Sequence, residues 1–365
     1  MSSTEGNPAW PPDARVLLLQ PAFLGDAVLS TAILESWHRE FPGHRLSILV
    51  RKGAHRLFEG HPFIEQLFIW DRSGWAKYQR LAAMAKFVRS RHFDGIINLH
   101  RYGSMALLAR AARPKWATGF SEGSRLQAGH TRQVVHSWGD GRHETERNHS
   151  QIAPWVGAWN AEVDRPRLHP AARDFDDASQ WPQGALLLAP ASVWATKRWP
   201  AERWSSLADA WAERHPDQDI MLIGGPEDGA LLGRIAGECQ LAKPKMCAGN
   251  LDLLGTAALM SQSSLVVSND SAPLHMAGAM DVPHVAVFCS TTADFGFGVV
   301  PIMEKNGRAL NVEIPPDALQ CKPCGPHGHK RCPLGHFRCG LDLGIEQVLE
   351  AMETVSSPPS GSRTL

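Results

Sequence analysis

Several features that would assign this chain of 365 residues to a common class are missing from it. No apolar run approaches the ~20 residues that a membrane-spanning helix needs. The stretch from Met1 to Asp13 is polar and contains proline, without the basic segment and apolar core of a signal peptide. The 37 Lys and Arg residues balance the 37 Asp and Glu residues, so no strong excess of positive charge favours nucleic acid. We therefore expect a globular, cytoplasmic protein with no nucleic-acid partner.

Two common phosphate-binding motifs are also absent. The chain contains no G-x-x-x-x-G-K-[ST] loop, and no G-x-G-x-x-G follows its first predicted strand. P-loop and dinucleotide-binding interpretations therefore lose their main support. The sequence also has no internal repeat.

Short apolar segments of strand and helix length alternate along the chain. With 43% hydrophobic and 20% charged residues the chain can bury a sizeable core, and its length favours two domains. Continuous apolar runs predict buried strands at 15–19, 45–50, 68–70, 95–99, 185–189, 219–223, 264–268 and 284–288. Helical spacing of apolar residues is found at 27–41, 75–91, 201–213 and 251–261. This alternation predicts an α/β protein with two doubly wound parallel sheets.

A polar, proline-containing stretch from Asp164 to Pro170 predicts a linker between the two halves. We therefore expect a first domain at 1–170, a second at 171–345, and a C-terminal helix with a disordered tail at 346–365. Residues 1–13 are expected to form a frayed lead-in. Ligands of doubly wound sheets bind at the carboxyl ends of the strands, so we expect a cleft between the halves.

The net charge of zero conceals an asymmetry between the halves. Residues 1–170 contain 22 basic and 15 acidic residues, a balance of +7, and the remainder contains 15 and 22, a balance of −7. A basic half indicates an anionic partner for that half. The alternative is a chance distribution of solvated side chains.

The segment from Leu265 to Met280 combines an apolar run, a short polar loop and a helix pattern. Asp270 and Ser271 are helix-capping residue types, and Pro273 suits a first helical turn. Free N–H groups at such a helix start attract phosphate, and His275 could add a side-chain donor. The alternative is an ordinary capped helix with a solvated histidine.

Polar residues also follow two other predicted strands of the second half. Lys197 is suited to neutralise a phosphate and Ser192 to donate a hydrogen bond, although a solvated basic pair before a helix is an equal alternative. Glu227, in a glycine-bearing loop, could accept from ribose hydroxyls, or cap a helix with Asp228. Three such loops at corresponding strand ends favour a site for a nucleotide diphosphate.

Four of the seven cysteines lie near the C-terminus, and without a signal peptide reduced thiols are expected. These four could hold a structural tetrahedral zinc, with His327, His329 and His336 interleaved. They are Cys321, Cys324, Cys332 and Cys339. The alternative is reduced thiols that pack a compact loop. No catalytic metal is expected in this segment.

Together these residues resemble the lipopolysaccharide heptosyltransferases of glycosyltransferase family 9. The matching segments are Leu24-Gly25-Asp26, Arg113–Phe120, His143–Asn148, Lys197-x-Trp199-Pro200, Gly224-Gly225, Asn269–His275, Cys321–Cys324 and Cys332–His336. The last two resemble a segment of heptosyltransferase II-like members. The resemblance runs from about Arg15 to Met352, and it depends on the order and spacing of several motifs.

The resemblance implies a GT-B fold, in which two Rossmann-like domains face each other and bind acceptor and donor respectively. It implies the transfer of L-glycero-D-manno-heptose from ADP-heptose, with inversion, to the inner core of lipopolysaccharide. It also implies catalysis without a cofactor. A lipid-linked anionic acceptor implies peripheral contact with the cytoplasmic face of the inner membrane.

The resemblance also assigns roles to residues at matching positions. Asp26 matches the general base, which deprotonates the acceptor hydroxyl; its alternative role is to cap the following helix. The donor-binding residues are Ser192, Lys197, Glu227, Asp270, Ser271, Ala272 and His275. Lys197 also acts catalytically, because its charge stabilises the departing ADP. Ala272 departs from the glycine that family members often have, and its methyl group narrows the approach to the donor.

The phosphorylated sugars of such an acceptor suit the basic first half. Candidate contacts are Arg51, Lys52, Arg56, Arg101 and Arg125, although basic residues are often only solvated. Two other enzyme functions remain open: a family 9 transferase that uses another nucleotide sugar or acceptor (an O-chain or a natural product), and a nucleotide-sugar epimerase of GT-B shape. A non-catalytic binding module would have no need of Asp26.

Overall fold

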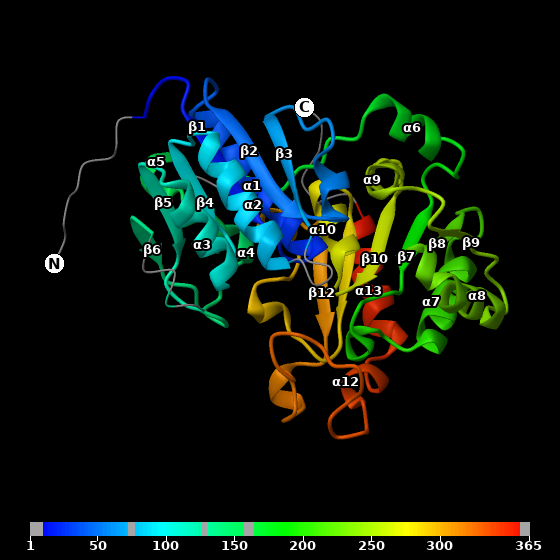
Figure 1. Cartoon of the computed structure of the whole chain (residues 1–365). Helices are drawn as coiled ribbons and strands as arrows, with labels where there is room; N and C mark the ends of the chain where they lie inside the picture. Colours follow the sequence, from blue (N-terminus) through cyan, green and yellow to red (C-terminus); the bar gives the residue numbers. More distant parts are fainter. Residues whose placement is uncertain (1–9, 72–76, 124, 126–129, 157–163, 358–365) are drawn as a thin grey trace, which may run out of the picture. The chain divides into compact units, whose positions relative to one another are not determined.

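The computed structural model describes residues 10–71, 77–123, 125, 130–156 and 164–357 (Figure 1). Two compact units are present: residues 1–137 and 144–169 belong to the first, and residues 138–143 and 170–365 to the second. The chain therefore passes between the units three times. The passage after His169 lies in the predicted linker, whereas the short excursion at 138–143 has no sequence signal.

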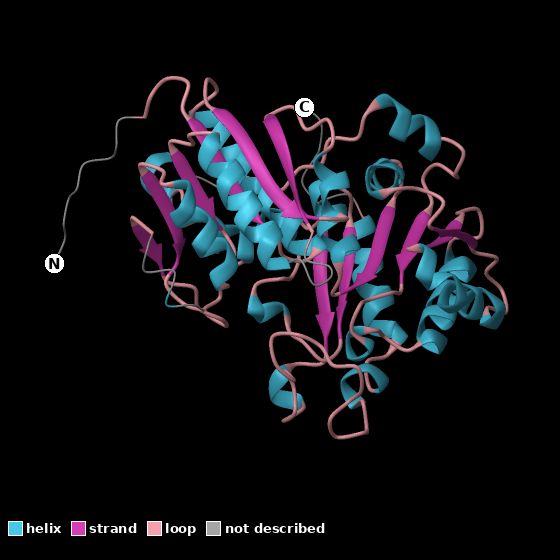
Figure 2. Ribbon diagram, in the orientation of Figure 1, coloured by secondary structure: helices cyan, strands magenta, loops and turns pink. Residues whose placement is uncertain are grey.

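The first unit is built on a parallel sheet with the strand order β3-β2-β1-β4-β5-β6. Its strands are β1 (Arg15–Gln20), β2 (Arg45–Arg51), β3 (Ile64–Trp70), β4 (Gly95–Asn98), β5 (Trp116–Phe120) and β6 (Arg132–Val134). Its helices are α1 (Leu24–Glu40), α2 (Lys77–Ser90), α3 (Gly103–Ala112), α4 (Glu144–His149) and α5 (Ala153–Val156), with a 3₁₀ turn η1 (Ala54–Phe58). Alternate residues of β1, such as Leu17 and Leu19, join α2 and α3 in one apolar core, while α1 packs with α4. Helices thus cover the sheet on both sides (Figure 2).

The second unit repeats this plan with the order β12-β11-β10-β7-β8-β9, again all parallel. Its strands are β7 (Leu186–Ala189), β8 (Ile220–Gly224), β9 (Lys245–Ala248), β10 (Leu265–Asn269), β11 (His284–Phe288) and β12 (Ala309–Glu313). Its helices are α6 (Ala172–Ala178), α7 (Ala201–Arg214), α8 (Gly229–Glu238), α9 (Leu253–Ser261), α10 (Ala272–Ala279), α11 (Pro301–Lys305), α12 (Arg338–Leu341) and α13 (Ile345–Ser356). The main core lies between the sheet and α7, α8 and α13, and it contains the buried rings of Trp199, Trp204 and Trp211.

Both strand orders reverse direction at one point, between β1 and β4 in the first unit and between β7 and β10 in the second. In doubly wound folds, ligands bind at the carboxyl ends of the strands at such a point, where the loops after the two neighbouring strands run in opposite directions. We therefore expect functional side chains in the loops after β1, β4, β7 and β10.

Several boundaries differ from the sequence-based expectations. The helix predicted at 27–41 begins at Leu24, so Phe23 holds the N-cap position and Asp26 lies inside the first turn. The alternative of Asp26 as a cap is therefore wrong. Trp10, expected in a frayed lead-in, instead packs 5.5 Å from Trp37 and 5.8 Å from Trp155 between ring centroids.

Four outer strands, β5, β6, β9 and β12, were not predicted from the sequence. β6 and β9 are largely exposed and β12 is mostly half-buried, so these three need no continuous apolar run, whereas β5 is mostly buried but contains Thr118 and Gly119. The predicted disordered tail lies mainly outside the described residues, as do residues 1–9 of the lead-in. In the part of the chain that is described, no helix is both long and apolar enough to cross a membrane.

Candidate active site

The carboxyl ends of β7 and β10 bring two predicted donor-binding segments together in the second unit. The loop after β7 contains Ser192 and a 3₁₀ turn η3 (Ala195–Lys197), and β10 runs directly into Asp270, Ser271 and α10. These strands are paired, with Leu188 opposite Val267. The two loops therefore start side by side at the point where the strand order reverses.

An ion pair links these loops. The Nζ atom of Lys197 lies 2.6 Å from Oδ2 of Asp270, and Thr291 Oγ1 donates a 2.6 Å hydrogen bond to the same oxygen. The two charged side chains are only 14% and 7% exposed. A charge-assisted bond this short is strong. Lys197 is therefore part of a buried ion pair, and it is not the solvated side chain of the alternative interpretation. Asp270 thus holds Lys197 at the carboxyl edge and does not cap α10.

Asn269, the last residue of β10, connects the same two loops. Its Oδ1 accepts a 2.9 Å hydrogen bond from the backbone N–H of Trp199, and its Nδ2 donates a 2.6 Å hydrogen bond to the Pro190 carbonyl. Both ends of the loop that carries Lys197 are therefore fixed to the last residue of β10. Because a buried amide with both ends bonded rarely changes rotamer, the position of Lys197 is defined by the fold.

The start of α10 offers backbone donors. Ser271 is the N-cap, but its hydroxyl makes no capping bond and donates instead to the Asn269 carbonyl at 3.3 Å. Within the described residues, the N–H groups of Ser271 and Ala272 have no backbone acceptor, and Pro273 has no N–H. Unbonded donors at a helix start, together with the helix dipole, suit a phosphate.

His275 is buried rather than solvated, so that alternative is wrong. Burial, together with the neighbouring His143, Lys197 and His284, lowers its pKa to about 3. The side chain is therefore a neutral imidazole at pH 7, and its Nδ1 has no hydrogen-bond partner among the residues that the structure describes. A neutral ring can still give one hydrogen bond to an anion, but it contributes no positive charge.

Glu227 lies one strand further along the same edge, in the 3₁₀ turn η4 (Pro226–Asp228) after β8. It is exposed, while Asp228 caps the turn by accepting from the Gly225 N–H at 2.9 Å. Capping is therefore done by Asp228 alone. Ser192 is almost fully buried, and its carbonyl accepts a 2.6 Å bond from Arg198 Nε. The predicted donor residues thus share the edge formed by β8, β7 and β10.

The cysteine-rich segment at 321–339 packs against the Lys197 loop. Thr196 Oγ1 accepts a 2.7 Å bond from the His329 N–H, and the Thr196 N–H donates to the His329 carbonyl over 3.1 Å. Gly328 approaches so closely that a Cβ atom there would lie 2.6 Å from Trp194 Cβ and 2.9 Å from Lys197 Cγ. The segment therefore supports the loop of the candidate site, a role that the sequence did not reveal.

The four cysteines of this segment are not gathered into a ready-made metal site. Cys321 Sγ lies 3.8 Å from His336 Nε2, and Cys324 Sγ contacts the Cys321 carbonyl at 3.2 Å. Among the described residues, however, no three ligand atoms of this segment lie within 4.8 Å of one another. Zinc binding here would require the sulfur atoms to move together, and it stays a prediction.

In the first unit, Asp26 lies in the loop and first turn that follow β1, half-buried. The positive end of the helix dipole favours its ionised form. Arg101 follows β4, the strand next to β1, so it belongs to the same edge. Arg51 ends β2, with its guanidinium 5.7 Å from the Phe23 ring at the start of α1. The fold therefore places Asp26, Arg51 and Arg101 at one edge of the sheet.

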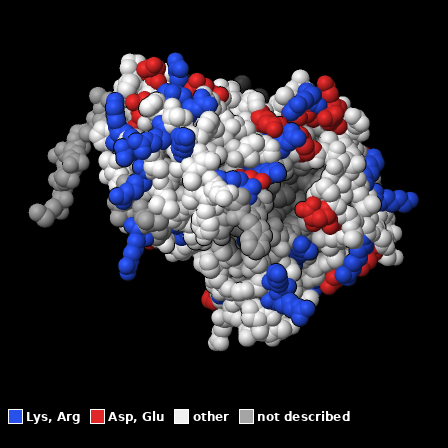
Figure 3. Space-filling model, in the orientation of Figure 1, with Lys and Arg blue, Asp and Glu red and all other residues white. Residues whose placement is uncertain are grey.

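The other predicted acceptor residues differ in their surroundings. Lys52 lies 3.7 Å from Asp71, and Arg56 lies 2.9 Å from Glu59, so both already have carboxylate partners within the unit. Arg125 is exposed. Figure 3 shows Lys and Arg side chains gathered on the part of the first unit that carries α2 and α3.

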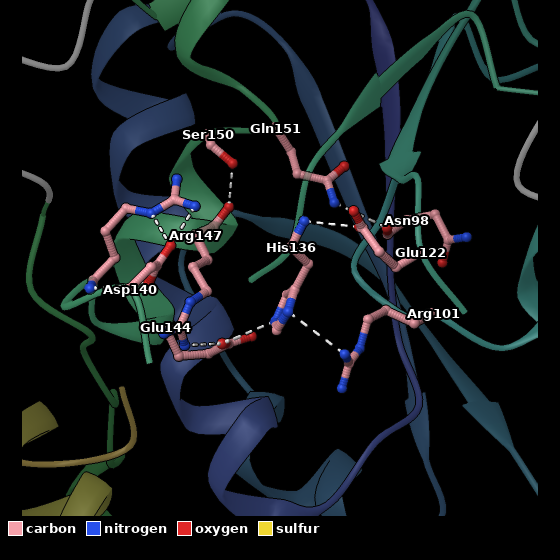
Figure 4. Close-up of polar contacts among 10 residues, drawn as sticks. Asn98, Arg101, Glu122, His136, Asp140, Glu144, Arg147, Ser150 and Gln151 are labelled. Atoms are coloured by element: carbon pink, nitrogen blue, oxygen red, sulfur yellow. Dashed lines mark hydrogen bonds and ion pairs between the residues drawn. The ribbon is translucent and has the colours of Figure 1, made fainter. Parts of the chain in front are cut away.

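A buried polar network lies behind Arg101, and sequence reasoning assigned it no role (Figure 4). His136 is central: its Nδ1 lies 3.5 Å from Arg101 Nη1 and its Nε2 lies 3.4 Å from Glu144 Oε2. Arg147, which is fully buried, pairs with Glu144 at 3.2 Å. Glu122 accepts the His136 N–H at 2.8 Å. One sequence feature could have indicated this network: Glu144 and Arg147 are three residues apart on a helix, a spacing that allows an ion pair.

Comparison with known proteins agrees with this architecture. A family model described as glycosyltransferase family 9 (heptosyltransferase) matches residues 81–321, more than half of the chain. Lipopolysaccharide heptosyltransferase 3 of Escherichia coli is 25% identical over 281 residues, which cover 74% of this chain and 82% of that protein.

Two solved structures are similar over almost their whole length. A family 9 glycosyl transferase from Veillonella parvula has a TM-score of 0.78 at 22% identity, covering 94% of this chain and 97% of that one. The ADP-heptose lipopolysaccharide heptosyltransferase II of E. coli has a TM-score of 0.73 at 16% identity, covering 94% and 98%. These likenesses confirm the predicted α/β fold of GT-B type.

Proposed function

Because this chain belongs to glycosyltransferase family 9 and is a transferase, we propose that it moves L-glycero-D-manno-heptose from ADP-heptose to the inner core of lipopolysaccharide. Its similarity to lipopolysaccharide heptosyltransferases supports this proposal. The observation that carries the proposal is the arrangement of Lys197, Asp270 and the start of α10 at the β7–β10 edge. It presents one ammonium group and free N–H groups where a nucleotide diphosphate would bind.

The donor binds in the second unit. Its diphosphate contacts Lys197 and the N–H groups of Ser271 and Ala272, and Glu227 accepts from the ribose hydroxyls. Asp270 is a positioning residue, because it holds the ammonium group of Lys197 in place without contacting the donor. Burial lowers the pKa of His275 and keeps its ring neutral. The neutral ring still has one N–H group, which donates a hydrogen bond to the phosphate.

The reaction inverts the anomeric carbon. Asp26 accepts the proton of the acceptor hydroxyl, whose oxygen forms the new bond to C1 of the heptose. The bond from C1 to the phosphate oxygen breaks at the same time, and its electron pair leaves with ADP. Lys197 and the α10 N–H groups stabilise the charge that develops on ADP. None of these steps requires a metal ion or another cofactor.

The acceptor is the anionic, lipid-linked core, and it binds to the first unit. Arg51 and Arg101 lie at the same edge as Asp26 and are suited to contact its phosphates. Lys52 and Arg56 each lie in an exposed pair with a carboxylate, from which their charged groups can turn toward the acceptor. The lipid part of such an acceptor brings the enzyme to the cytoplasmic face of the inner membrane as a peripheral protein.

A transfer assay with ADP-heptose tests the proposal, using Kdo-lipid A and heptosyl-Kdo-lipid A as alternative acceptors. We expect transfer to one of them, and Asp26→Asn should lower kcat by about 10²- to 10⁴-fold, the usual contribution of a general base. ADP affinity should not change. Glu40→Gln is the control, because Glu40 lies at the other end of α1 and its carboxylate forms an exposed pair with Arg39.

Two results would contradict the proposal in different ways. Full activity of Asp26→Asn would remove the assignment of the base while leaving the substrates intact. Turnover of another nucleotide sugar, with none of ADP-heptose, would instead identify a different transferase of the family. Conversion of a sugar nucleotide without any acceptor would indicate an epimerase.

A further inference from the structure

Three segments of the first unit bring Glu35, His61 and His169 together, away from the residues assigned to transfer. Glu35 lies on α1, His61 follows η1, and His169 is the last residue before the chain enters the second unit. One ligand atom from each side chain lies within 4.8 Å of the other two. Among the described residues this is the one such group of three histidine, cysteine or acidic side chains.

The contacts within this group already approach those of a metal site. His169 Nε2 lies 3.2 Å from Glu35 Oε1, and the rings of His61 and His169 are 4.6 Å apart at an angle of 72°. Ligand atoms around a tetrahedral zinc with bonds of about 2.0–2.1 Å are separated by roughly 3.3 Å. The three ligand atoms lie within 4.8 Å of one another, so closing the group onto an ion needs a shift of at most about 1.5 Å, not a rearrangement of the fold.

His61 supplies the independent sign of a missing ligand. The residue is 95% buried, and within the described part of the chain its Nε2 atom has no hydrogen-bond partner. Its Nδ1 accepts a weak 3.3 Å bond from the Phe63 N–H. A buried polar atom without a partner destabilises a fold, and in native structures it often marks an absent ion or water. An ion on Nε2 would satisfy this atom, and the ring proton would move to Nδ1 at the loss of the weak bond from the Phe63 N–H.

We propose that Glu35, His61 and His169 bind a divalent transition metal such as Zn²⁺ or Co²⁺. Two imidazole nitrogens and one carboxylate are ligands that such ions prefer over the all-oxygen sets of Mg²⁺ and Ca²⁺. Arg167 opposes the ion, because its Nε lies 3.7 Å from the second oxygen of Glu35. The Arg167 side chain is more than half exposed, so it can turn away into solvent.

The place of the site in the chain indicates its purpose. Residues 164–169 lie along α1: Ser36 donates to Asp164 over 2.6 Å, and Thr31 accepts from the Arg167 N–H at 2.9 Å. His169, the last residue of the first unit, already contacts Glu35 of α1 at 3.2 Å, and a shared metal ion would replace this contact with two coordination bonds. The ion therefore fastens the segment that leads into the second unit to α1, the helix that carries Asp26.

Tag-free protein stripped with a chelator and titrated with Co²⁺ tests this proposal. We expect about one equivalent bound with an absorption spectrum typical of nitrogen and oxygen ligands. Glu35→Gln and His169→Gln should each raise the Co²⁺ dissociation constant at least tenfold, because each removes a direct ligand. His38→Gln is the matched control: His38 is on the same helix and stacks on Phe63, but it is not in the group.

A second measurement separates this site from the cysteine-rich segment. Added Co²⁺ should slow amide hydrogen exchange at residues 164–169 in the wild type and not in His169→Gln. The proposal is overturned if Glu35→Gln and His169→Gln bind Co²⁺ like the wild type. It is equally overturned if the only bound ion shows sulfur-to-cobalt charge transfer that Cys332→Ser abolishes. His169 is partly exposed, so His169→Gln is expected to fold whether or not an ion binds.

Discussion

Breaking the Lys197–Asp270 ion pair should destabilise the second unit strongly, and unequally from its two sides. At 2.6 Å, and with an effective dielectric constant near 20, the gross attraction is about 6 kcal/mol. Much of it offsets the cost of burying both charges, so removing one partner costs about 3–5 kcal/mol. Lys197→Met leaves Asp270 with the hydroxyl of Thr291 and should cost the lower figure. Asp270→Asn leaves the ammonium without a carboxylate among the described residues and should cost the higher.

Replacing both partners should restore most of the loss. The double variant Lys197→Met with Asp270→Asn contains no uncompensated charge, so we expect it within about 1 kcal/mol of the wild type. Glu238→Gln is the control, because it breaks the exposed Arg234–Glu238 pair on α8, whose separation is also short at 2.7 Å. Exposed pairs of this kind contribute little to stability, so the control should behave like the wild type.

Native-state amide hydrogen exchange of residues 265–279 is the suitable measurement, because global unfolding of a two-unit chain is not a two-state process. Single substitutions that each cost less than 1 kcal/mol, or a double-mutant cycle with no coupling, would refute a buried, structurally important pair. Both results would mean that the pair behaves like the surface control.

ADP binding distinguishes the two members of this pair. Lys197→Met should weaken ADP affinity roughly 10- to 100-fold, since a hydrogen bond to a charged group contributes about 1.5–3 kcal/mol. Asp270→Asn releases the ammonium group of Lys197 but also removes a negative charge close to the diphosphate, so it should lower ADP affinity less than Lys197→Met does. Equal losses in both variants would contradict the assignment of Asp270 as a positioning residue.

Three further predictions follow from the second unit. Gly328→Ala should lower ADP affinity and leave the fold intact, because its Cβ would lie 2.9 Å from Lys197 Cγ, whereas Gly233→Ala, with open space around it, should change nothing. His275 has its pKa lowered from 6.5 to about 3 by burial, so its contribution to stability is complete above pH 6.5 and is lost as the pH falls toward 3. Its replacement by Asn should therefore flatten the pH dependence of thermal stability by at most about 1.4 kcal/mol per pH unit in that range. Zinc analysis of tag-free protein should give a stoichiometry that falls in Cys332→Ser; a wild-type value near zero would remove the zinc hypothesis.

The candidate donor residues could be found in the sequence because each follows a strong apolar run. The strands before Lys197, Glu227 and Asp270 are buried on both faces, so they are uninterrupted apolar segments whose ends are easy to locate. Their order along the chain predicts a shared edge. It does not reveal that Lys197 and Asp270 neutralise each other, since that depends on the rotamers of two side chains 73 positions apart in the sequence.

The first unit was harder to predict. The network around His136 joins residues from the loops after β4, β5 and β6 and from α4, and two of these strands are short or partly exposed. Its members are polar residues in polar stretches, which in sequence look like a solvated surface. Their burial depends on packing against distant segments, so only the assembled unit could show it.

The sequence alone determined the fold class, the two repeated α/β halves and the loops that carry the candidate site, because backbone hydrogen bonding and burial of strands leave a local apolar pattern. Tertiary structure decided which polar groups meet: the Lys197–Asp270 pair, the support of that loop by Gly328 and His329, and the group of Glu35, His61 and His169. Such contacts join side chains far apart in the chain, and no local pattern records their geometry.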